Sequence, residues 1–304
     1  MREAMADDAG ADLVDRPPWL PRAQYPFTVR RRDEPGGAVA YIDEGTGPTL
    51  LFVHAGLWSF VFRDVITRLR ADFRCVALDF PGFGLAPPTA GAPSLADLGG
   101  VLTTFVTGLD LRDVTVVAHD LGGPVAFAAA AALPGRVAGL VLANTFAWTP
   151  DRPGLRAMLR VVGARATEEV GAATNVVALL TSTRFGVGRH LDRDGRAAFR
   201  GPFHARAVRR RFHRLMASTL GRPAFTDGVE RAVATVLTDT PVLTIFGARN
   251  DPFGFQARLA KRFADHEGVV VEHGNHFPMM DDPDLFASSV HDWHRRRVAP
   301  RLTS

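Results

Sequence analysis

An aspartate at a sharp strand-to-helix junction is the residue of this sequence best placed to do chemistry. Asp120 ends the run Val-Val-Ala-His-Asp and is followed at once by Leu-Gly-Gly-Pro, so small residues follow it closely. A turn of this kind presents its central side chain at the end of a strand, and it needs small neighbours because the backbone is crowded. A carboxylate is already ionised at neutral pH and can attack a saturated carbon without a base. The alternative is that Asp120 only caps the helix that starts near Gly122.

Two further loops carry residues that could complete a catalytic set. The stretch Glu-His-Gly-Asn-His-Phe-Pro places His276 after an apolar strand, with His273 as a competitor closer to that strand. The stretch Gly-Ala-Arg-Asn-Asp-Pro places Asp251 after the preceding strand. A histidine can take a proton from water, and a carboxylate can fix the tautomer of its ring. We therefore predict Asp120 as nucleophile, His276 as general base and Asp251 as the residue that orients His276.

The elements that must position these residues alternate between strands and helices. Apolar runs predict strands at residues 39–44, 49–54, 74–80, 113–119, 137–143, 242–247 and 268–272. Helical patterns follow at residues 60–69, 94–109, 124–133, 255–263 and 285–297, with Ser94 as a predicted N-cap. Because the strands are apolar throughout rather than alternating, both faces of the sheet should be covered. The fold class is therefore α/β, a doubly wound and mostly parallel sheet.

Residues 150–225 interrupt this alternation. They contain no convincing strand and are too long for a loop, so they predict a helical lid over the sheet. Residues 151–225 hold 15 Arg against 5 Asp and Glu, a charge of +10, which leaves −6 for the rest of a chain whose net charge is +4. Such a lid would steer acidic substrates toward a cleft, although most of its arginines are simply expected to be solvated. We assign residues 1–36 to a polar N-terminal extension and residues 37–149 and 226–304 to the α/β core.

The sequence resembles the α/β-hydrolase superfamily, and within it the haloalkane dehalogenases and epoxide hydrolases that use an aspartate as nucleophile. The matching stretches are residues 54–60, 78–84, 144–148, the Asp120 turn and the two loops that carry Asp251 and His276. The resemblance covers about residues 38–150 and 235–295 and is closest to the haloalkane dehalogenases. It implies an α/β-hydrolase fold with the helical lid inserted after the sixth strand. It also implies cofactor-free hydrolysis through an alkyl ester on Asp120.

The resemblance also suggests which groups surround the nucleophile. The backbone N–H of Leu121 and an N–H near Ala55 and Gly56 are the expected oxyanion donors. His54, Trp58 and Trp148 are candidate pocket residues.

The chain departs from both the haloalkane dehalogenases and the epoxide hydrolases at the residue that stabilises the leaving group. Leu121 stands where dehalogenases carry a tryptophan that binds the halide. Epoxide hydrolases use lid tyrosines as acids, whereas Tyr25 and Tyr41 are the only tyrosines here and both precede the elbow. Carbon–halide hydrolysis is the preferred prediction. The alternatives are an epoxide hydrolase with an atypical acid, drawn from the lid histidines His190, His204 and His213, and a non-catalytic ligand-binding pseudo-hydrolase.

Composition narrows the function classes further. One cysteine, Cys75, rules out an internal disulfide framework, and no apolar run approaches the ~18 residues of a membrane span. A cytoplasmic monomer or homodimer is expected, acting on a small molecule that could be anionic, with neither nucleic acid nor membrane as partner. No nucleotide fingerprint and no zinc set around His291 and His294 is found, so no cofactor or metal is expected.

Overall fold

A single sheet organises the chain. The structure is a computed structural model and describes residues 12–183 and 186–303. In this part of the chain nine strands pair in the order β1-β2-β3-β5-β4-β6-β7-β8-β9. Their bounds are β1 (Asp12–Leu13), β2 (Arg30–Arg32), β3 (Val39–Glu44), β4 (Thr49–His54), β5 (Arg74–Asp79), β6 (Val114–His119), β7 (Val137–Ala143), β8 (Val242–Gly247) and β9 (His266–Val271).

In sheet order, the strands β5, β4, β6, β7, β8 and β9 pair parallel to one another. At the other edge, β1, β2 and β3 pair antiparallel. All six residues of β6 and of β8 are buried, as expected for strands covered on both faces. The seven predicted strands are β3 to β9, each within two residues of its predicted bounds. The predicted α/β-hydrolase fold with a mostly parallel sheet is therefore confirmed.

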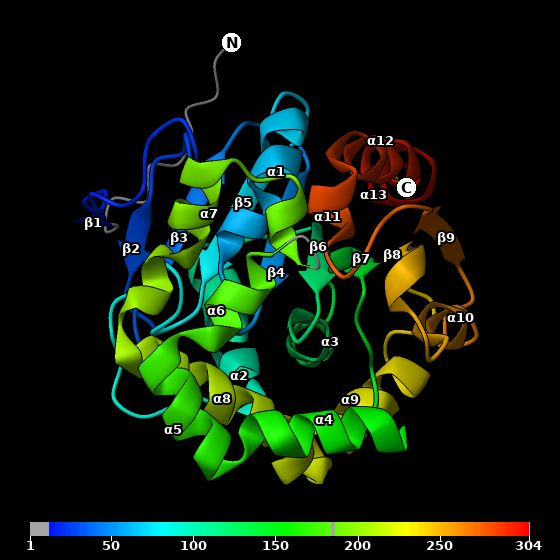
Figure 1. Ribbon diagram of the computed structural model, residues 1–304. Coiled ribbons are helices and arrows are strands. Elements are labelled where there is room, and N and C mark those ends of the chain that lie inside the picture. The colour runs from blue at the N-terminus through cyan, green and yellow to red at the C-terminus, as the bar shows by residue number, and fades with distance from the viewer. Residues whose placement is uncertain (1–11, 184–185, 304) are drawn as a thin grey trace.

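Helices cover both faces of the sheet and enclose two apolar clusters (Figure 1). One face is covered by α1 (Arg63–Leu69), α11 (Pro278–Asp281) and α12 (Pro283–Trp293), and the other by α2 (Leu95–Gly108), α3 (Gly122–Ala132), α9 (Pro223–Thr235) and α10 (Phe255–Ala260). The α/β domain also contains four short helical segments: η1 (Ser59–Phe62), η4 (Ala248–Asn250), the π-helical η5 (His294–Val298) and α13 (Ala299–Leu302). None of the described helices combines the length and the apolar character needed to cross a bilayer.

Local signals explain where these helices begin. Ser94 caps α2 in a reciprocal capping box with Asp97, as predicted. Asp282 accepts a hydrogen bond from the backbone of Leu285 and so caps α12. The sequence prediction merged η1 with α1 and ran the last helix from α12 into η5, because one apolar pattern continues across each boundary.

A helical insertion lies between β7 and β8, and β7 is the sixth strand of the sheet when counted from β2. It comprises α4 (Pro153–Gly163), α5 (Arg165–Thr174), α6 (Val176–Thr181), η2 (Val187–Arg189), α7 (Arg193–Arg200), η3 (Gly201–His204) and α8 (Arg206–Gly221). In Figure 1 α4, α5 and α8 lie side by side, and α8 packs on both of the others. The next helix, α9, packs against α3 and so belongs with the core, which puts the start of the returning core close to residue 223.

The N-terminal segment differs from its predicted character over residues 12–36. Leu20, Tyr25 and Phe27 are each only 1% exposed and belong to the main apolar cluster. The Tyr25 hydroxyl also hydrogen-bonds the Ser59 hydroxyl at 2.7 Å. The polar composition of the segment hid a few large side chains that pack against η1. Residues 1–11 of the predicted extension lie outside the described residues.

Candidate active site

The turn after β6 places Asp120 in a strained conformation at the carboxyl end of the sheet. Its φ of +50° lies in the left-handed region, which a non-glycine residue adopts only when its surroundings enforce it. A Cβ at position 122 would collide with the carbonyl oxygen of Val53, and one at position 123 would collide with the Thr145 side chain. The two glycines therefore let α3 start directly behind the nucleophile position. The Thr145 hydroxyl donates to the Asp120 carbonyl at 2.6 Å and fixes the turn.

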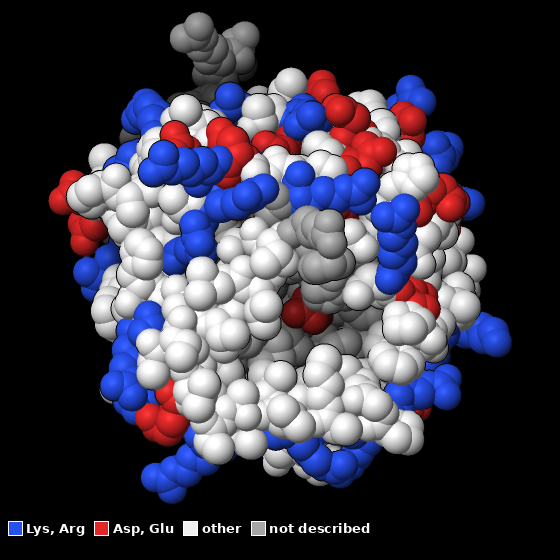
Figure 2. All heavy atoms as spheres, in the orientation of Figure 1, with Lys and Arg blue, Asp and Glu red and all other residues white. Residues whose placement is uncertain are grey.

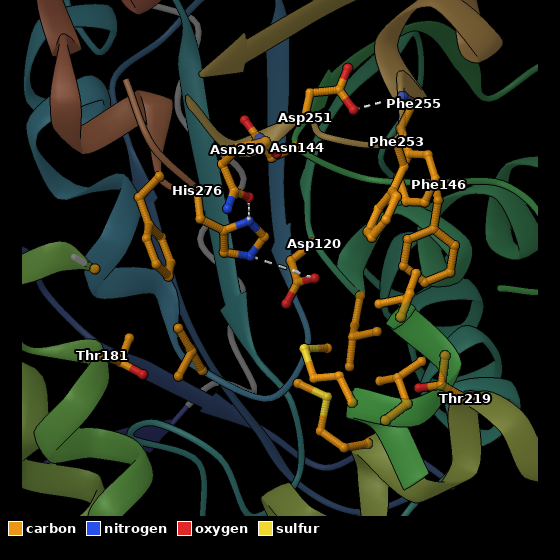
Figure 3. Close-up of a pocket in the computed structure, with 18 of the residues that line it drawn as sticks. Asp120, Asn144, Phe146, Thr181, Thr219, Asn250, Asp251, Phe253, Phe255 and His276 are labelled. Atoms are coloured by element: carbon orange, nitrogen blue, oxygen red, sulfur yellow. Dashed lines mark hydrogen bonds and ion pairs between the residues drawn. The ribbon is translucent and has the colours of Figure 1, made fainter. Parts of the chain in front are cut away.

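The loop after β9 brings His276 to the same point. Its Nε2 lies 3.7 Å from Asp120 Oδ1, and Figure 3 shows the imidazole facing the carboxylate. The loop is held from behind by the His119 ring, whose Nε2–H donates to the backbone oxygen of His276 at 2.6 Å. It is held from the front by Asp281, which accepts from the Asn275 backbone at 2.6 Å. The sequence-predicted pair of Asp120 and His276 thus lies together in the folded chain.

The predicted partner of His276 does not lie with it. His276 Nδ1 is 2.9 Å from Oδ1 of Asn250, the residue before Asp251. The Asp251 carboxylate instead accepts from the backbone N–H groups of Phe255 and Gln256 at 2.6 and 3.0 Å, at the start of α10. In Figure 3 it points away from the imidazole. The expected contact between Asp251 and His276 is therefore replaced by one from Asn250.

Sequence reasoning missed Asn250 and also Asn144. The Asn144 amide donates to the carbonyl of Asn250 at 3.0 Å and accepts from the Gly247 N–H at 2.9 Å, so it holds the loop after β8. The available signal was an Asn-Asp pair in one loop. The choice between these two neighbours depends on the loop backbone, which the sequence does not display.

The carboxylate of Asp120 is held in its ionised form. Burial is the largest influence and opposes ionisation, but the contact with His276 and the electrostatic influence of the His276, His119 and His54 imidazoles together outweigh it and lower the Asp120 pKa to about 2. The side chain keeps 23% of its surface open, toward the cavity, which limits the cost of burying the charge. Asp120 is therefore negatively charged over the whole neutral range.

The cavity beside Asp120 is apolar and has a volume of about 500 Å³. Figure 2 shows the corresponding hollow with acidic atoms at its floor and uncharged atoms around it. Its apolar lining comes from core and lid alike: Leu57, Leu121, Phe146, Leu155, Met158, Leu159, Leu180, Phe212, Met216, Phe246, Phe253, Phe255 and Phe277. Apart from the loops that carry Asp120, Asp251 and His276, the polar side chains that line the cavity among the described residues are those of Asn144, Thr181 and Thr219.

Three predicted pocket residues lie outside this lining. Trp58 is fully buried and its indole N–H donates to the carbonyl of Phe199, on the lid. Trp148 packs edge-on against Phe255 and under the Arg258 guanidinium. His54 is buried behind the elbow with its ring 4.9 Å from that of His119, and burial, its largest influence, lowers its pKa to about 4. All three side chains are buried behind the residues that line the cavity, where their large rings fill the space between β4, the lid and α10.

The predicted oxyanion donors lie on the segments that follow two neighbouring strands, β4 and β6. Leu121 lines the cavity at the start of α3, where its N–H belongs to the helix N-terminus. Ala55 and Gly56 follow β4, the strand beside β6, and Gly56 has a φ of +92°. Leu57, the residue after them, lines the cavity.

The lid arginines that the structure describes do not line the cavity. No arginine or lysine is part of its lining in the part of the chain that the structure describes. Lid arginines instead hold the lid itself: Arg214 pairs with Glu168, and Arg206 and Arg210 pair with Glu169. Figure 2 shows the basic side chains around the hollow rather than in it. An apolar wall does not offset the cost of burying a second charge beside Asp120.

The alternative acids of the epoxide hypothesis also lie away from Asp120. His190 is 3.2 Å from Asp281, His204 is exposed, and His213 is buried with its Nδ1 2.8 Å from the Val162 carbonyl. None of these three lines the cavity as described. Tyr25 and Tyr41 are buried in the core.

The fold and this site define a class. Residues 50–289 match the alpha/beta hydrolase family, and the chain belongs to that family. Among solved structures it is similar to the haloalkane dehalogenase DbeA from Bradyrhizobium elkani USDA94, with a TM-score of 0.79, 22% identity and coverage of 90% of this chain and 99% of that one. At this identity the likeness shows the fold.

Sequence relatives narrow the class to haloalkane-dehalogenase-like hydrolases. The chain is 32% identical over 273 residues to Haloalkane dehalogenase 2 of Mycobacterium tuberculosis, covering 88% of this chain and 94% of that protein. It is 29% identical over 288 residues to a haloalkane dehalogenase of Mycolicibacterium paratuberculosis, covering 89% and 94%. The protein is therefore a haloalkane-dehalogenase-like hydrolase.

Proposed function

We propose that this hydrolase cleaves carbon–halogen bonds through a covalent alkyl ester on Asp120. The observation that carries the proposal is an ionised carboxylate on a tight elbow, 3.7 Å from an imidazole and open to an apolar cavity. An Asp120 oxygen attacks the carbon that bears the halogen from the side opposite the halogen. The carbon–halogen bond breaks, the halide leaves with the bonding pair, and the carboxylate becomes a neutral ester.

Hydrolysis of the ester regenerates the enzyme. His276 Nε2 takes a proton from a water molecule as the water oxygen bonds to the ester carbonyl carbon. The tetrahedral oxyanion is stabilised by the N–H of Leu121 and by an N–H of the segment around Ala55 and Gly56. Collapse of the intermediate breaks the bond to the alkyl oxygen, which takes the proton from His276 and leaves as the alcohol. The Asp120 carboxyl group then ionises, so the net products are alcohol, halide and one proton.

The substrate class that fits this cavity is neutral and apolar. Its wall consists of leucine, methionine and phenylalanine side chains, and its volume of about 500 Å³ suits a small organic molecule. A carboxylate on the substrate would meet Asp120 with no described arginine or lysine in the lining to balance it. Bromoalkanes of medium length are therefore the first substrates to test.

The test is to trap the intermediate. His276→Ala removes the base for the second step and leaves the first step intact, so with 1-bromohexane the intact mass should rise by one hexyl group, with one bromide released per site. Peptide mapping should place the adduct on Asp120. The matched control is His273→Ala, an exposed histidine three residues away, whose adduct should decay as in wild type, whereas the adduct of His276→Ala should persist.

The contrary results are distinct. Reversible binding of the bromoalkane to His276→Ala with no mass change and no bromide would favour a non-catalytic ligand-binding protein. A diol formed from an epoxide substrate, without any bromide from bromoalkanes, would favour an epoxide hydrolase.

A further inference from the structure

We infer that Asn250, and not the neighbouring Asp251, positions His276, and that this neutral partner makes hydrolysis of the ester the slow step. The inference rests on the proposed function, because it concerns the second of its two steps. It assigns a positioning role that is distinct from the predicted Asp120, His276 and Asp251 set.

The contact fixes the tautomer of the imidazole. The Asn250 carboxamide oxygen only accepts hydrogen bonds, so at 2.9 Å it is served by an Nδ1–H of His276. The proton on Nδ1 leaves a lone pair on Nε2, the atom that faces Asp120 at 3.7 Å. A neutral amide can therefore set the imidazole in the form that a base requires.

Backbone contacts hold Asn250 in this place. Its carbonyl accepts from the Asn144 amide at 3.0 Å, and the preceding Arg249 N–H donates to the Gly274 carbonyl at 3.1 Å. The second contact ties the loop after β8 to the loop that carries His276. Asn250 and His276 therefore keep their relative positions without help from Asp251.

Asp251 is committed elsewhere. Both of its carboxylate oxygens accept backbone N–H groups at the first turn of α10, at 2.6 and 3.0 Å. Turning this side chain toward His276 would leave both donors without that acceptor (Figure 3). Its role is that of a helix cap, with a charge that suits a helix N-terminus.

The missing charge matters most after Asp120 has been alkylated. In the ester state Asp120 is neutral, so an imidazolium on His276 would be hydrogen-bonded only to a neutral amide. Hydrogen bonds to charged partners are roughly twice as strong as neutral ones, and a carboxylate would stabilise the imidazolium that forms as water gives up its proton. The first step gains nothing from such a carboxylate, because Asp120 attacks without a base. Ester formation should therefore outrun ester hydrolysis.

Rapid-mixing kinetics with 1-bromohexane test this directly. Wild type should release about one bromide per site in a burst and then turn over more slowly, with the hexyl adduct visible by intact mass. Asn250→Asp supplies a charged partner of the same shape and should speed decay of the adduct roughly tenfold while leaving the burst rate unchanged. Asn250→Ala should slow the decay roughly a hundredfold, because the ring is no longer oriented.

The comparison variant is Asp251→Asn, which makes the reverse change at the next residue. It should weaken the start of α10, seen as a lower melting temperature, and leave adduct decay as in wild type. Slower decay in Asp251→Asn with wild-type decay in both Asn250 variants would overturn the inference. Equal decay in all four proteins would overturn it as well. If no adduct and no bromide form in any variant, the proposed function itself fails.

Discussion

At the scale of single residues, the groups around Asp120 favour nucleophilic attack, whereas the cavity wall gives little help to the departing halide. Asp120 lies on a strained elbow, faces the imidazole of His276 and has a lowered pKa. The halide, by contrast, would depart into a wall formed by side chains such as Leu57 and Leu121, which donate no hydrogen bond. Cleavage of the carbon–halogen bond should therefore be slower than it would be with an indole donor, and it should favour good leaving groups such as bromide and iodide.

Replacing Leu121 should repair this deficit. Leu121→Trp puts an indole N–H beside Asp120 in the cavity, and the burst phase of bromide release from 1-bromohexane should become roughly tenfold faster, the value of one hydrogen bond to a charged group. Leu121→Phe is the matched control, since it adds an aromatic ring without a donor. Equal rates for the two variants would show that bulk, rather than the donor, limits the reaction.

At the scale of elements, a buried arginine ties the lid helix α8 to the core. Arg211 on α8 is 4% exposed, and its guanidinium donates to the carbonyls of Gly82, Thr89 and Gly91 at 2.7, 2.8 and 3.3 Å. The next residue on α8, Phe212, lines the cavity. The loop of residues 82–91 and the lid wall are therefore held in register by the same helix.

Arg211→Met should detach this contact. Three carbonyl groups lose a charged donor, so the free energy of unfolding should fall by about 2 kcal/mol in urea titration, and KM should rise because the cavity wall loosens. Arg214→Met, on the same helix, removes an ion pair with Glu168 from a side chain that is 53% exposed, and it should cost less than about 1 kcal/mol. A loss as large in Arg214→Met would refute a specific role for Arg211.

At the scale of the whole molecule, two buried histidines couple folding to pH. His54 and His119 are at most 2% exposed, and burial is the main reason that the pKa of His54 falls to about 4 and that the pKa of His119 falls well below its usual value. Both are neutral in the folded protein, whereas in the unfolded chain they take up protons below about pH 6.5. Their contribution to stability is therefore complete above that pH and is lost as pH falls toward 4.

His119→Gln should reduce this acid sensitivity. Each such histidine steepens the fall of unfolding free energy by about 1.4 kcal/mol per pH unit, so the variant should show a slope smaller by that amount between pH 6 and pH 5. Glutamine keeps a donor for the His276 carbonyl. Urea titrations at several pH values give the slopes, and His291→Gln, on the surface of α12, is the control that should match wild type. An unchanged slope in His119→Gln would mean that its ring is already protonated in the folded state.

The sequence by itself determined the parts of this protein that depend on local pattern. Apolar runs placed β3 to β9, a capping pair placed α2, and a strand followed by Asp-Leu-Gly-Gly placed the elbow. His276 could be found because it follows a strand that is parallel to β6, and parallel strands end at one edge of a sheet. These inferences need only the period of the pattern and the chain order.

The tertiary structure alone decided which neighbours meet. Asn250 and Asp251 are adjacent, and only the path of the loop after β8 turns the first toward His276 and the second toward α10. Trp58 and Trp148, predicted to line the cavity, are instead buried behind it. Where a large ring packs depends on the space that the surrounding elements leave, which the sequence does not show. The lid arginines Arg206, Arg210 and Arg214 pair with Glu168 and Glu169 instead of lining the cavity, because an ionised side chain in an apolar cavity would lose its hydration without gaining a partner.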